Sequence, residues 1–203
     1  MRIFVTGIGT EVGKTVIAAI LTEALQADYW KPVQAGELDY SDTHKVEELI
    51  SNSKSHFHEE TFRLNHPMSP HAAAERDEVE ICLSDFQIPS TDNHLVIEGA
   101  GGLMVPINKK DCIIDLIEQI EAEVILVSRH YLGSINHTLL SIEALQKRHI
   151  PIKGIIFNGS ENKDTESIIL SMSGVRLLGR ITEEESIDKT VILKYAQQFK
   201  EAL

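Results

Sequence analysis

Hydrophobic residues in this chain fall into short runs, separated by longer stretches with helix-like spacing. Residues 124–127 and 154–157 are apolar on successive positions, which is typical of strands buried on both faces of a parallel sheet. We expect strands at 3–5, 28–33, 94–98, 123–128, 152–158 and 176–181, and helices at 16–25, 42–51, 111–122, 134–148, 164–171 and from about 187, with a less regular segment at 54–92. This alternation predicts a three-layer α/β fold in which helices flank a mostly parallel central sheet.

A glycine-rich segment joins the first expected strand to the first expected helix, and it reads Gly7-Ile8-Gly9-Thr10-Glu11-Val12-Gly13-Lys14-Thr15. Glycines let backbone N–H groups turn toward an anion, and the N-terminus of the following helix favours negative charge. Lys14 would reach the outer phosphates of a nucleotide, while the Thr15 hydroxyl could ligate Mg²⁺. Five residues separate Gly7 from Gly13, one more than in the common P-loop motif. The segment predicts nucleotide binding; an ordinary strand–turn–helix connection is the alternative.

Other candidate residues also stand where expected strands end, which is where an open parallel sheet collects its ligands. Lys31 precedes Pro32, which breaks the strand and leaves the ammonium at the ligand edge; a solvated surface lysine is the alternative. Glu98 closes an apolar strand next to Gly99-Ala100-Gly101-Gly102, the place of a Walker-B-type Mg²⁺ ligand. Asp42 begins a helix, so it could ligate a metal or simply favour the helix N-terminus.

Size and composition narrow the class of protein. The chain has 203 residues and no repeat or low-complexity linker, so residues 1–203 are expected to form one domain. Its 19 basic and 31 acidic residues give a formal charge of −12, which disfavours nucleic acid or an anionic membrane as a partner. No apolar run approaches the roughly 18 residues of a membrane span, and the N-terminus already has a strand pattern rather than that of a signal peptide. Cys82 and Cys112 lack a Cys-x-x-Cys spacing, so we expect reduced core thiols and a cytoplasmic location.

The ordered motifs resemble those of the dethiobiotin synthetase family. The blocks that carry the resemblance are Thr6 to Thr15, Lys31-Pro32-Val33-Gln34-Ala35-Gly36, Ser69-Pro70-His71, Glu98 to Gly102, Leu132-Gly133-Ser134-Ile135-Asn136-His137 and Asn158. The resemblance implies a P-loop NTPase-like ligase of biotin biosynthesis, with ATP as co-substrate and Mg²⁺ as cofactor. It would close 7,8-diaminopelargonic acid (7,8-diaminononanoate) with CO₂ into dethiobiotin, through a carbamate and a carbamic-phosphoric anhydride.

The resemblance also implies roles for individual residues. Lys31 and Lys14 would be catalytic, and Thr15, Asp42 and Glu98 would hold the metal. ATP would be bound by Thr10, Glu11, Val12, Gly13, Lys14, Thr15, Val16, Asp42, Glu98, Gly99, Ala100, Gly101, Asn158, Thr182, Glu183 and Glu184. The substrate would be bound by Lys31, Ala35, Ser69, Pro70, Gly101, Gly133, Ser134 and Asn136. The block at 132–137 would cross the two-fold axis of a homodimer and complete the partner's substrate site.

Three positions depart from the family pattern, and two other functions remain open. Ala35 stands where a hydroxyl residue is usual, Tyr131 where a lysine is common, and Thr182 where a proline often follows the isoleucine. A switch ATPase of the partitioning or septum-positioning type shares the expected fold, but its extra P-loop lysine has no counterpart in residues 8–12. A small-molecule phosphotransferase would leave the block at 132–137 unexplained.

Overall fold

The computed structural model describes residues 1–203 as alternating strands and helices. The strands are β1 (Arg2–Gly7), β2 (Asp28–Trp30), β3 (Val33–Ala35), β4 (Phe57–His58), β5 (Phe62–Leu64), β6 (Leu95–Gly102), β7 (Glu123–Arg129), β8 (Ile152–Asn158) and β9 (Leu177–Ile181). The helices are α1 (Lys14–Leu25), α2 (Asp42–Leu49), α3 (Pro70–Arg76), α4 (Ile113–Ile120), α5 (Ser134–Lys147), α6 (Lys163–Ser173) and α7 (Lys189–Phe199), with 3₁₀ turns η1 (Leu38–Tyr40) and η2 (Leu83–Asp85).

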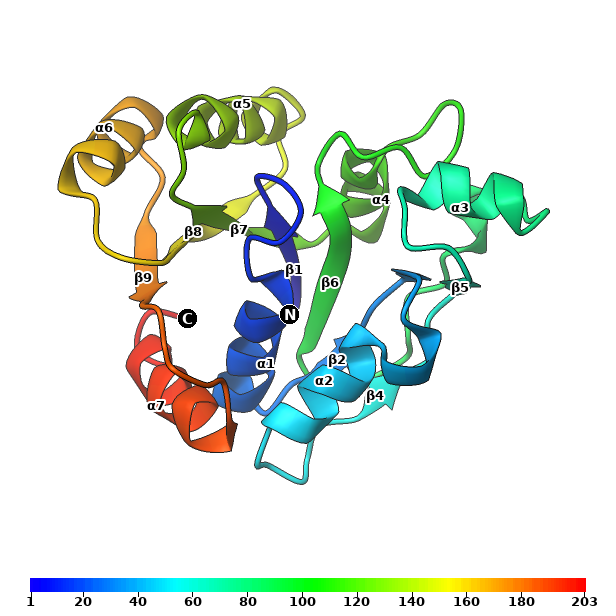
Figure 1. Ribbon diagram of the computed structural model, residues 1–203, viewed down its shortest axis with the longest axis horizontal. Helices are drawn as coiled ribbons and strands as arrows, with labels where there is room; N and C mark the ends of the chain where they lie inside the picture. The colour runs from blue at the N-terminus through cyan, green and yellow to red at the C-terminus, as the bar shows by residue number, and fades with distance from the viewer.

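Seven strands form the central sheet in the order β4-β2-β6-β1-β7-β8-β9. Every pairing within this sheet is parallel, so the expected α/β fold is confirmed and the sheet is parallel throughout. Helices α1, α2 and α7 lie on one face, and α4, α5 and α6 lie on the other (Figure 1). The predicted two-face burial is also confirmed, because residues 124–127 of β7 are completely buried.

Two elements differ from the sequence-based expectation, and both differences involve long-range pairing. The strand expected at 28–33 is interrupted at Lys31 and Pro32, since proline has no N–H to donate to a ladder. The chain then leaves the central sheet, and β3 pairs with β5 in a separate two-stranded parallel sheet. Strand β6 continues past Glu98, because its glycine run remains paired with β1 as far as Gly102 opposite Gly7.

Hydrophobic side chains on both faces of the sheet make the core. The α1 face includes Ile17 and Ile20 of α1 with Tyr195 and Phe199 of α7, all buried. Burying one such aliphatic or aromatic side chain contributes about 1.5–3 kcal/mol relative to leaving it exposed. The two layers therefore hold the carboxyl ends of the strands as a rigid edge.

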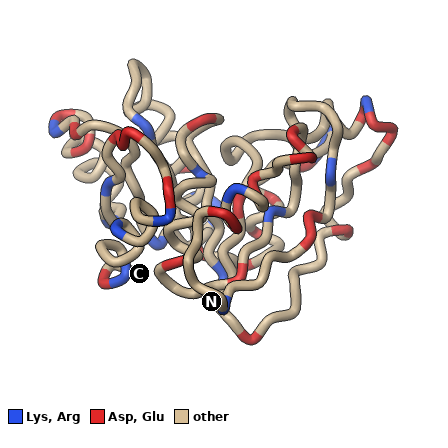
Figure 2. The backbone as a smooth tube through the Cα atoms, turned by 60° about the horizontal axis from the view of Figure 1, so that its bottom comes forward, with Lys and Arg blue, Asp and Glu red and all other residues tan.

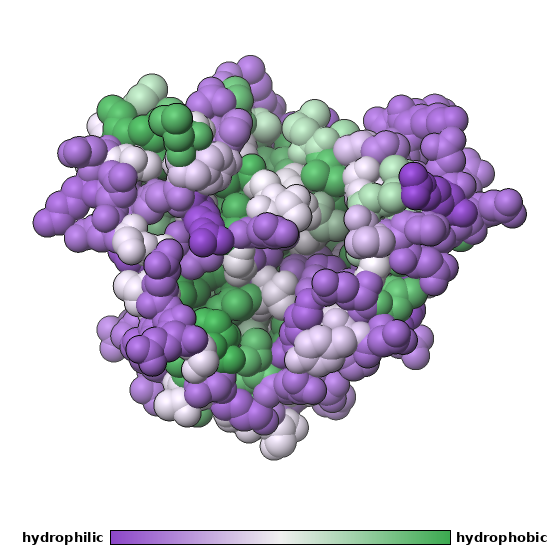
Figure 3. Space-filling model, viewed as in Figure 1, coloured by the Kyte–Doolittle hydropathy of each residue, from purple (hydrophilic) through white to green (hydrophobic).

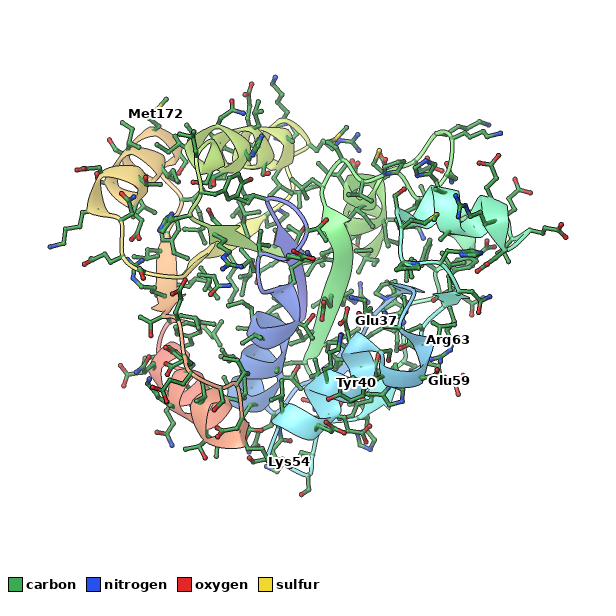
Figure 4. The ribbon with its side chains drawn as sticks, viewed as in Figure 1. Glu37, Tyr40, Lys54, Glu59, Arg63 and Met172 are labelled. Atoms are coloured by element: carbon green, nitrogen blue, oxygen red, sulfur yellow. The ribbon has the colours of Figure 1, made fainter.

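Acidic and basic residues are both distributed over the whole fold (Figure 2). A hydrophobic patch covers α6 in the upper left of Figure 3, where Ile168 and Met172 are exposed and Figure 4 marks Met172.

Cys82 and Cys112 are free, as expected, but both are half-buried rather than core residues. None of the helices combines the length and the apolar character needed to cross a membrane.

Candidate active site at the carboxyl ends of the strands

The glycine-rich segment forms the turn from β1 into α1. Gly13 caps α1 in the left-handed region with a φ of 94°, and a Cβ there would lie 2.3 Å from Asn158 Nδ2, so only glycine fits. Lys14 is the first residue of α1, and its side chain is buried while Nζ donates to the Gly9 carbonyl at 3.0 Å. The ammonium thus lies along the inner side of the loop, beside the N–H groups at the helix start.

The charged centre of the site lies between β2, β6 and the starts of α1 and α2. Lys31 Nζ lies 2.5 Å from Asp42 Oδ2 and 3.0 Å from Glu98 Oε1. The Thr15 hydroxyl donates to the same Glu98 oxygen at 2.8 Å. Lys31 is 5% exposed and Glu98 is 1% exposed, so the pair is largely removed from water. Four groups from four elements of the chain therefore meet at one point.

Each charge in this centre depends on the others. Burial alone would lower the pKa of Lys31, but the carboxylates of Glu98 and Asp42 raise it above its usual value. Burial would raise the pKa of Asp42, but the ammonium groups of Lys31 and Lys45 together more than offset this, so the pKa of that carboxyl is lowered. Burial lowers the pKa of Lys14, and the nearby positive charge of Lys31 acts in the same direction. Negative phosphate groups would stabilise both ammonium groups.

The oxygen atoms of this centre fit a hard divalent cation. The Thr15 hydroxyl and the carboxylates of Asp42 and Glu98 are the ligand types that Mg²⁺ prefers, and the two carboxylates already enclose one cation, the ammonium of Lys31. No group of three or more His, Cys, Asp or Glu side chains has metal-binding geometry. Mg²⁺ commonly takes only one or two protein carboxylates and completes its shell with phosphate oxygens and water.

Several of the residues expected to bind ATP lie at or just after the ends of β8 and β9. Asn158 ends β8, and its Nδ2 donates to the Val12 carbonyl at 2.8 Å, which leaves Oδ1 as the free acceptor. Thr182 follows β9, and its N–H donates to the Tyr195 hydroxyl at 3.1 Å. Glu184 accepts from the same hydroxyl at 2.5 Å and from Lys194 at 2.8 Å. The expected ATP-binding segment at 182–184, which also includes Glu183, is thus hydrogen-bonded to α7 through Tyr195 and Lys194.

Apart from Lys31, which is part of the charged centre, the residues expected to bind the substrate make no hydrogen bond to that centre. Ala35 ends β3, while Ser69 and Pro70 begin α3. Gly133 caps α5, with Ser134 and Asn136 in its first turn. A cavity of about 310 Å³ connects this helix with the P-loop, and its lining includes Gly9, Thr10, Gly102, Met104 and His137. Of the residues predicted to bind ATP or substrate, only Thr10 lines this cavity, while α5 contributes His137 and the positions after it.

One residue of the charged centre was not among those predicted from the sequence. The Tyr29 hydroxyl donates to Glu98 Oε2 at 2.8 Å, and the tyrosine is completely buried. The signal that could have found it is strand periodicity, because Tyr29 and Lys31 are two positions apart and so lie on the same face.

Comparison with known proteins agrees with this fold. A family profile described as an AAA domain matches residues 1–191. A protein of Christiangramia forsetii named ATP-dependent dethiobiotin synthetase BioD is 58% identical over 200 residues, covering 98% of this chain and 96% of that protein. A protein of Cytophaga hutchinsonii with the same name is 51% identical over 196 residues, covering 96% and 95%.

Solved structures with the same fold are more distant in sequence. A putative plasmid partition protein from Borrelia burgdorferi bound to AMPPNP has a TM-score of 0.60 at 13% identity, covering 99% of this chain and 97% of its own. The cell division ATPase MinD of Pyrococcus furiosus has a TM-score of 0.59 at 14% identity, covering 100% and 99%. These likenesses establish the fold class, and the much higher identities to the curated relatives show that this chain belongs to the dethiobiotin synthetase family.

Proposed function

We propose that this protein is an ATP- and Mg²⁺-dependent ligase that closes 7,8-diaminopelargonic acid with CO₂ to dethiobiotin. The observation that carries the proposal is the meeting of Lys31 with Glu98, Asp42 and Thr15 beside the P-loop. A buried lysine at that point supplies fixed positive charge where a carboxylate-like group must approach a phosphoryl group. The full-length identity to proteins named ATP-dependent dethiobiotin synthetase supplies the substrate class.

The reaction would proceed in three balanced steps. One amine of the substrate attacks the carbon of CO₂, forms a C–N bond and loses a proton to give a carbamate. A carbamate oxygen then attacks the γ-phosphorus of ATP, and the bond to the ADP oxygen breaks. The second amine finally attacks the carbamoyl carbon, phosphate leaves with its oxygen, and a proton is released as the cyclic urea forms.

The side chains of the charged centre would divide the work of these steps. Lys14 and the N–H groups of the P-loop would bind the phosphates, while Thr15, Asp42 and Glu98 would hold Mg²⁺. Bound Mg²⁺ would counter the negative charge of the phosphate oxygens. Lys31 would hold the carbamate in line with the γ-phosphoryl group, exchanging its contacts to Asp42 and Glu98 for the carbamate oxygens.

The remaining predicted contacts form the outer parts of the proposed site. Asn158, with Oδ1 free to accept a hydrogen bond, and the segment Thr182, Glu183 and Glu184 would bind the adenine side of ATP. Gly99, Ala100 and Gly101 would approach the phosphate and carbamate with their backbone. Ser69, Pro70 and Ala35 would line the diamine, with Ala35 providing packing rather than a hydroxyl contact.

The proposal is tested by measuring phosphate release with and without diaminopelargonate and bicarbonate, together with the mass of the product. Release that requires both substrates, with formation of a cyclic urea, is the expected result. Equal release in the absence of the diamine would contradict the proposal and favour a switch ATPase, the class to which the partitioning and MinD neighbours belong.

We further propose a homodimer that shares its two substrate sites. Hydrophobic side chains remain exposed around the start of α5 and next to it: Leu132 is fully exposed, Met104 is 65% exposed and Leu140 is 54% exposed. Clustered exposed hydrophobic residues commonly mark a protein contact. Since a two-fold interface repeats each contact, Asn136 at the start of α5 would bind the substrate carboxylate in the partner's site.

Mixing two inactive variants tests this arrangement. Asn136→Ala and Lys31→Gln should each be nearly inactive yet dimeric by sedimentation. In a co-refolded equal mixture, random pairing would leave about a quarter of the sites free of both changes and restore about a quarter of parental activity. Activity no greater than the sum of the separate variants, with subunit exchange verified, would place Asn136 in its own chain's pocket.

A further inference from the structure

The carboxylate of Glu98 accepts hydrogen bonds on both of its oxygens, and on the side facing the core the donor is Tyr29. The Tyr29 hydroxyl donates to Glu98 Oε2 at 2.8 Å, whereas Oε1 accepts from Thr15 Oγ1 at 2.8 Å and from Lys31 Nζ at 3.0 Å. The two carboxylate oxygens therefore have separate partners. One oxygen faces the buried phenol, and the other faces the P-loop and the lysine.

Strand geometry explains how Tyr29 reaches the glutamate. Strands β2 and β6 are parallel neighbours, with Tyr29 opposite Val96 and Trp30 opposite Ile97. Because side chains alternate between faces, Tyr29 of β2 lies on the same face as Val96 and Glu98 of β6, and Lys31, just after β2, is two positions further along. Tyr29 thus stands one step back from the ligand edge, between the carboxylate and the core beneath α1.

The terminal torsion of a glutamate is intrinsically broad, so packing alone fixes a carboxylate poorly. A hydrogen bond to one oxygen restrains the rotation and keeps the other oxygen directed at its partners. A hydroxyl that is fully buried beside a carboxylate also has no water with which to exchange.

We propose that Tyr29 is a positioning residue for Mg²⁺-dependent nucleotide binding, acting through Glu98. It aims Oε1 at the Thr15 hydroxyl and the metal position. This inference rests on the proposed function only in that both need a Mg²⁺–nucleotide site. It says nothing about the diamine, so nucleotide binding without diamine or CO₂ tests it separately.

The alternative role for Tyr29 is packing, and one substitution separates the two. The tyrosine ring lies against Phe57, with ring centroids 5.9 Å apart, and Tyr29→Phe keeps this ring while removing only the hydroxyl. Metal sites lose roughly 10- to 100-fold in metal affinity when a partner that orients a ligand is removed. We therefore expect the half-saturating Mg²⁺ concentration to rise by about 10-fold in Tyr29→Phe.

The measurement is calorimetric binding of a non-hydrolysable ATP analogue, in a Mg²⁺ series and in excess chelator. Nucleotide affinity in chelator should stay within about twofold of the parent, while the enhancement by Mg²⁺ is weakened. A matched control is Tyr40→Phe. The Tyr40 hydroxyl also donates to a glutamate, Glu48, at 2.6 Å, but it lies on the exposed side of the η1–α2 segment (Figure 4). This control should leave the Mg²⁺ dependence unchanged.

A double-variant cycle tests whether Tyr29 acts through Glu98. In a Glu98→Gln background, Tyr29→Phe should cause no further change in the Mg²⁺ dependence, because the ligand that Tyr29 positions is already altered. Thermal melting would verify that each variant is folded. An unchanged Mg²⁺ dependence in Tyr29→Phe, or an equal loss of nucleotide affinity with and without Mg²⁺, would overturn the proposal and leave Tyr29 as a packing residue.

Discussion

The two ends of strand β2 each bury a charge, and the two charges are satisfied in different ways. Asp28 begins the strand and Lys31 follows its end, and they are 2% and 5% exposed. Asp28 accepts hydrogen bonds from Thr91 Oγ1 at 2.7 Å, from the His56 N–H at 3.0 Å and from Asn93 at 3.1 Å. Lys31 instead faces two carboxylates, those of Asp42 and Glu98.

The difference fits a structural role for Asp28 and the catalytic role that we propose for Lys31. The partners of Asp28 are mostly backbone and neutral side-chain donors at the amino ends of the strands, so its charge is satisfied by the fold itself. The partners of Lys31 stand at the carboxyl ends, where they are also suited to a metal and a nucleotide. A buried charge balanced by groups that can change partners is the arrangement expected of a catalytic centre.

Removing the charge of Lys31 should give the largest effect on activity. Lys31→Gln should lower kcat by about 10³-fold, because it deletes a preorganised charge at the transferring phosphoryl group, while nucleotide binding persists. The measurement is steady-state kinetics together with calorimetric ATP-analogue binding. Lys153→Gln is a matched control that removes a lysine paired with Glu123 at the amino end of β8, and it should leave kcat unchanged. A kcat of Lys31→Gln within about threefold of the parent would exclude transition-state stabilisation by Lys31.

The P-loop hydroxyl should give the next largest effect. Thr15→Val keeps the shape of the side chain but removes the group that donates to Glu98, so turnover should fall by about 10²-fold at saturating Mg²⁺. Thr15→Ser restores the hydroxyl and should recover most of the activity. Near-normal turnover in Thr15→Val, measured by phosphate release, would mean that the hydroxyl has no part in the metal site.

Local patterns predicted the two-face burial of the sheet and the position of the P-loop. Both depend on residues close together in the chain, such as the run at 124–127 and the turn into Lys14. The sequence also pointed to Lys31 and Glu98 individually, as residues at strand ends. Their contact joins positions 67 apart, and the pairing of β3 with β5, which moves the chain away after Lys31, also joins segments that are distant in the sequence. Neither can be deduced from periodicity. Periodicity places Tyr29 on the same face as Lys31, but it does not show that the Tyr29 hydroxyl reaches Glu98.

The amino end of β2 should respond in stability rather than in activity. Asp28→Asn replaces one of the two acceptor oxygens by an N–H₂ group, which then faces either the His56 N–H and Asn93 on the Oδ1 side or Thr91 on the Oδ2 side. Leaving buried polar groups unsatisfied costs about 1–3 kcal/mol, so urea unfolding should show a loss of that size with little change in kcat. The exposed neighbour Asp92 is the control, and Asp92→Asn should change stability by less than about 0.5 kcal/mol. A large fall in kcat of Asp28→Asn with unchanged stability would contradict the distinction between a structural charge at the amino end of β2 and a catalytic charge after its carboxyl end.

The smallest expected effect is the pH dependence of the difference in unfolding free energy between the parent and Asp28→Asn. Burial would raise the pKa of Asp28, but the hydrogen bonds from Thr91, the His56 N–H, Asn93 and His58 together lower it. A carboxyl whose folded pKa is depressed contributes stability above its unfolded pKa, about 3.9, and loses that contribution as the pH falls through the folded value.

The difference in unfolding free energy between the parent and Asp28→Asn should therefore stay constant from pH 7 to about 5 and then narrow below about pH 4. One pKa unit corresponds to only about 1.4 kcal/mol, so the comparison needs urea titrations of both proteins at each pH. A difference that widened on acidification would mean that the fold favours the protonated carboxyl. The ionised carboxylate of Asp28 would then destabilise the folded protein, and Asp28 could no longer be contrasted with Lys31 as a charge that the fold stabilises.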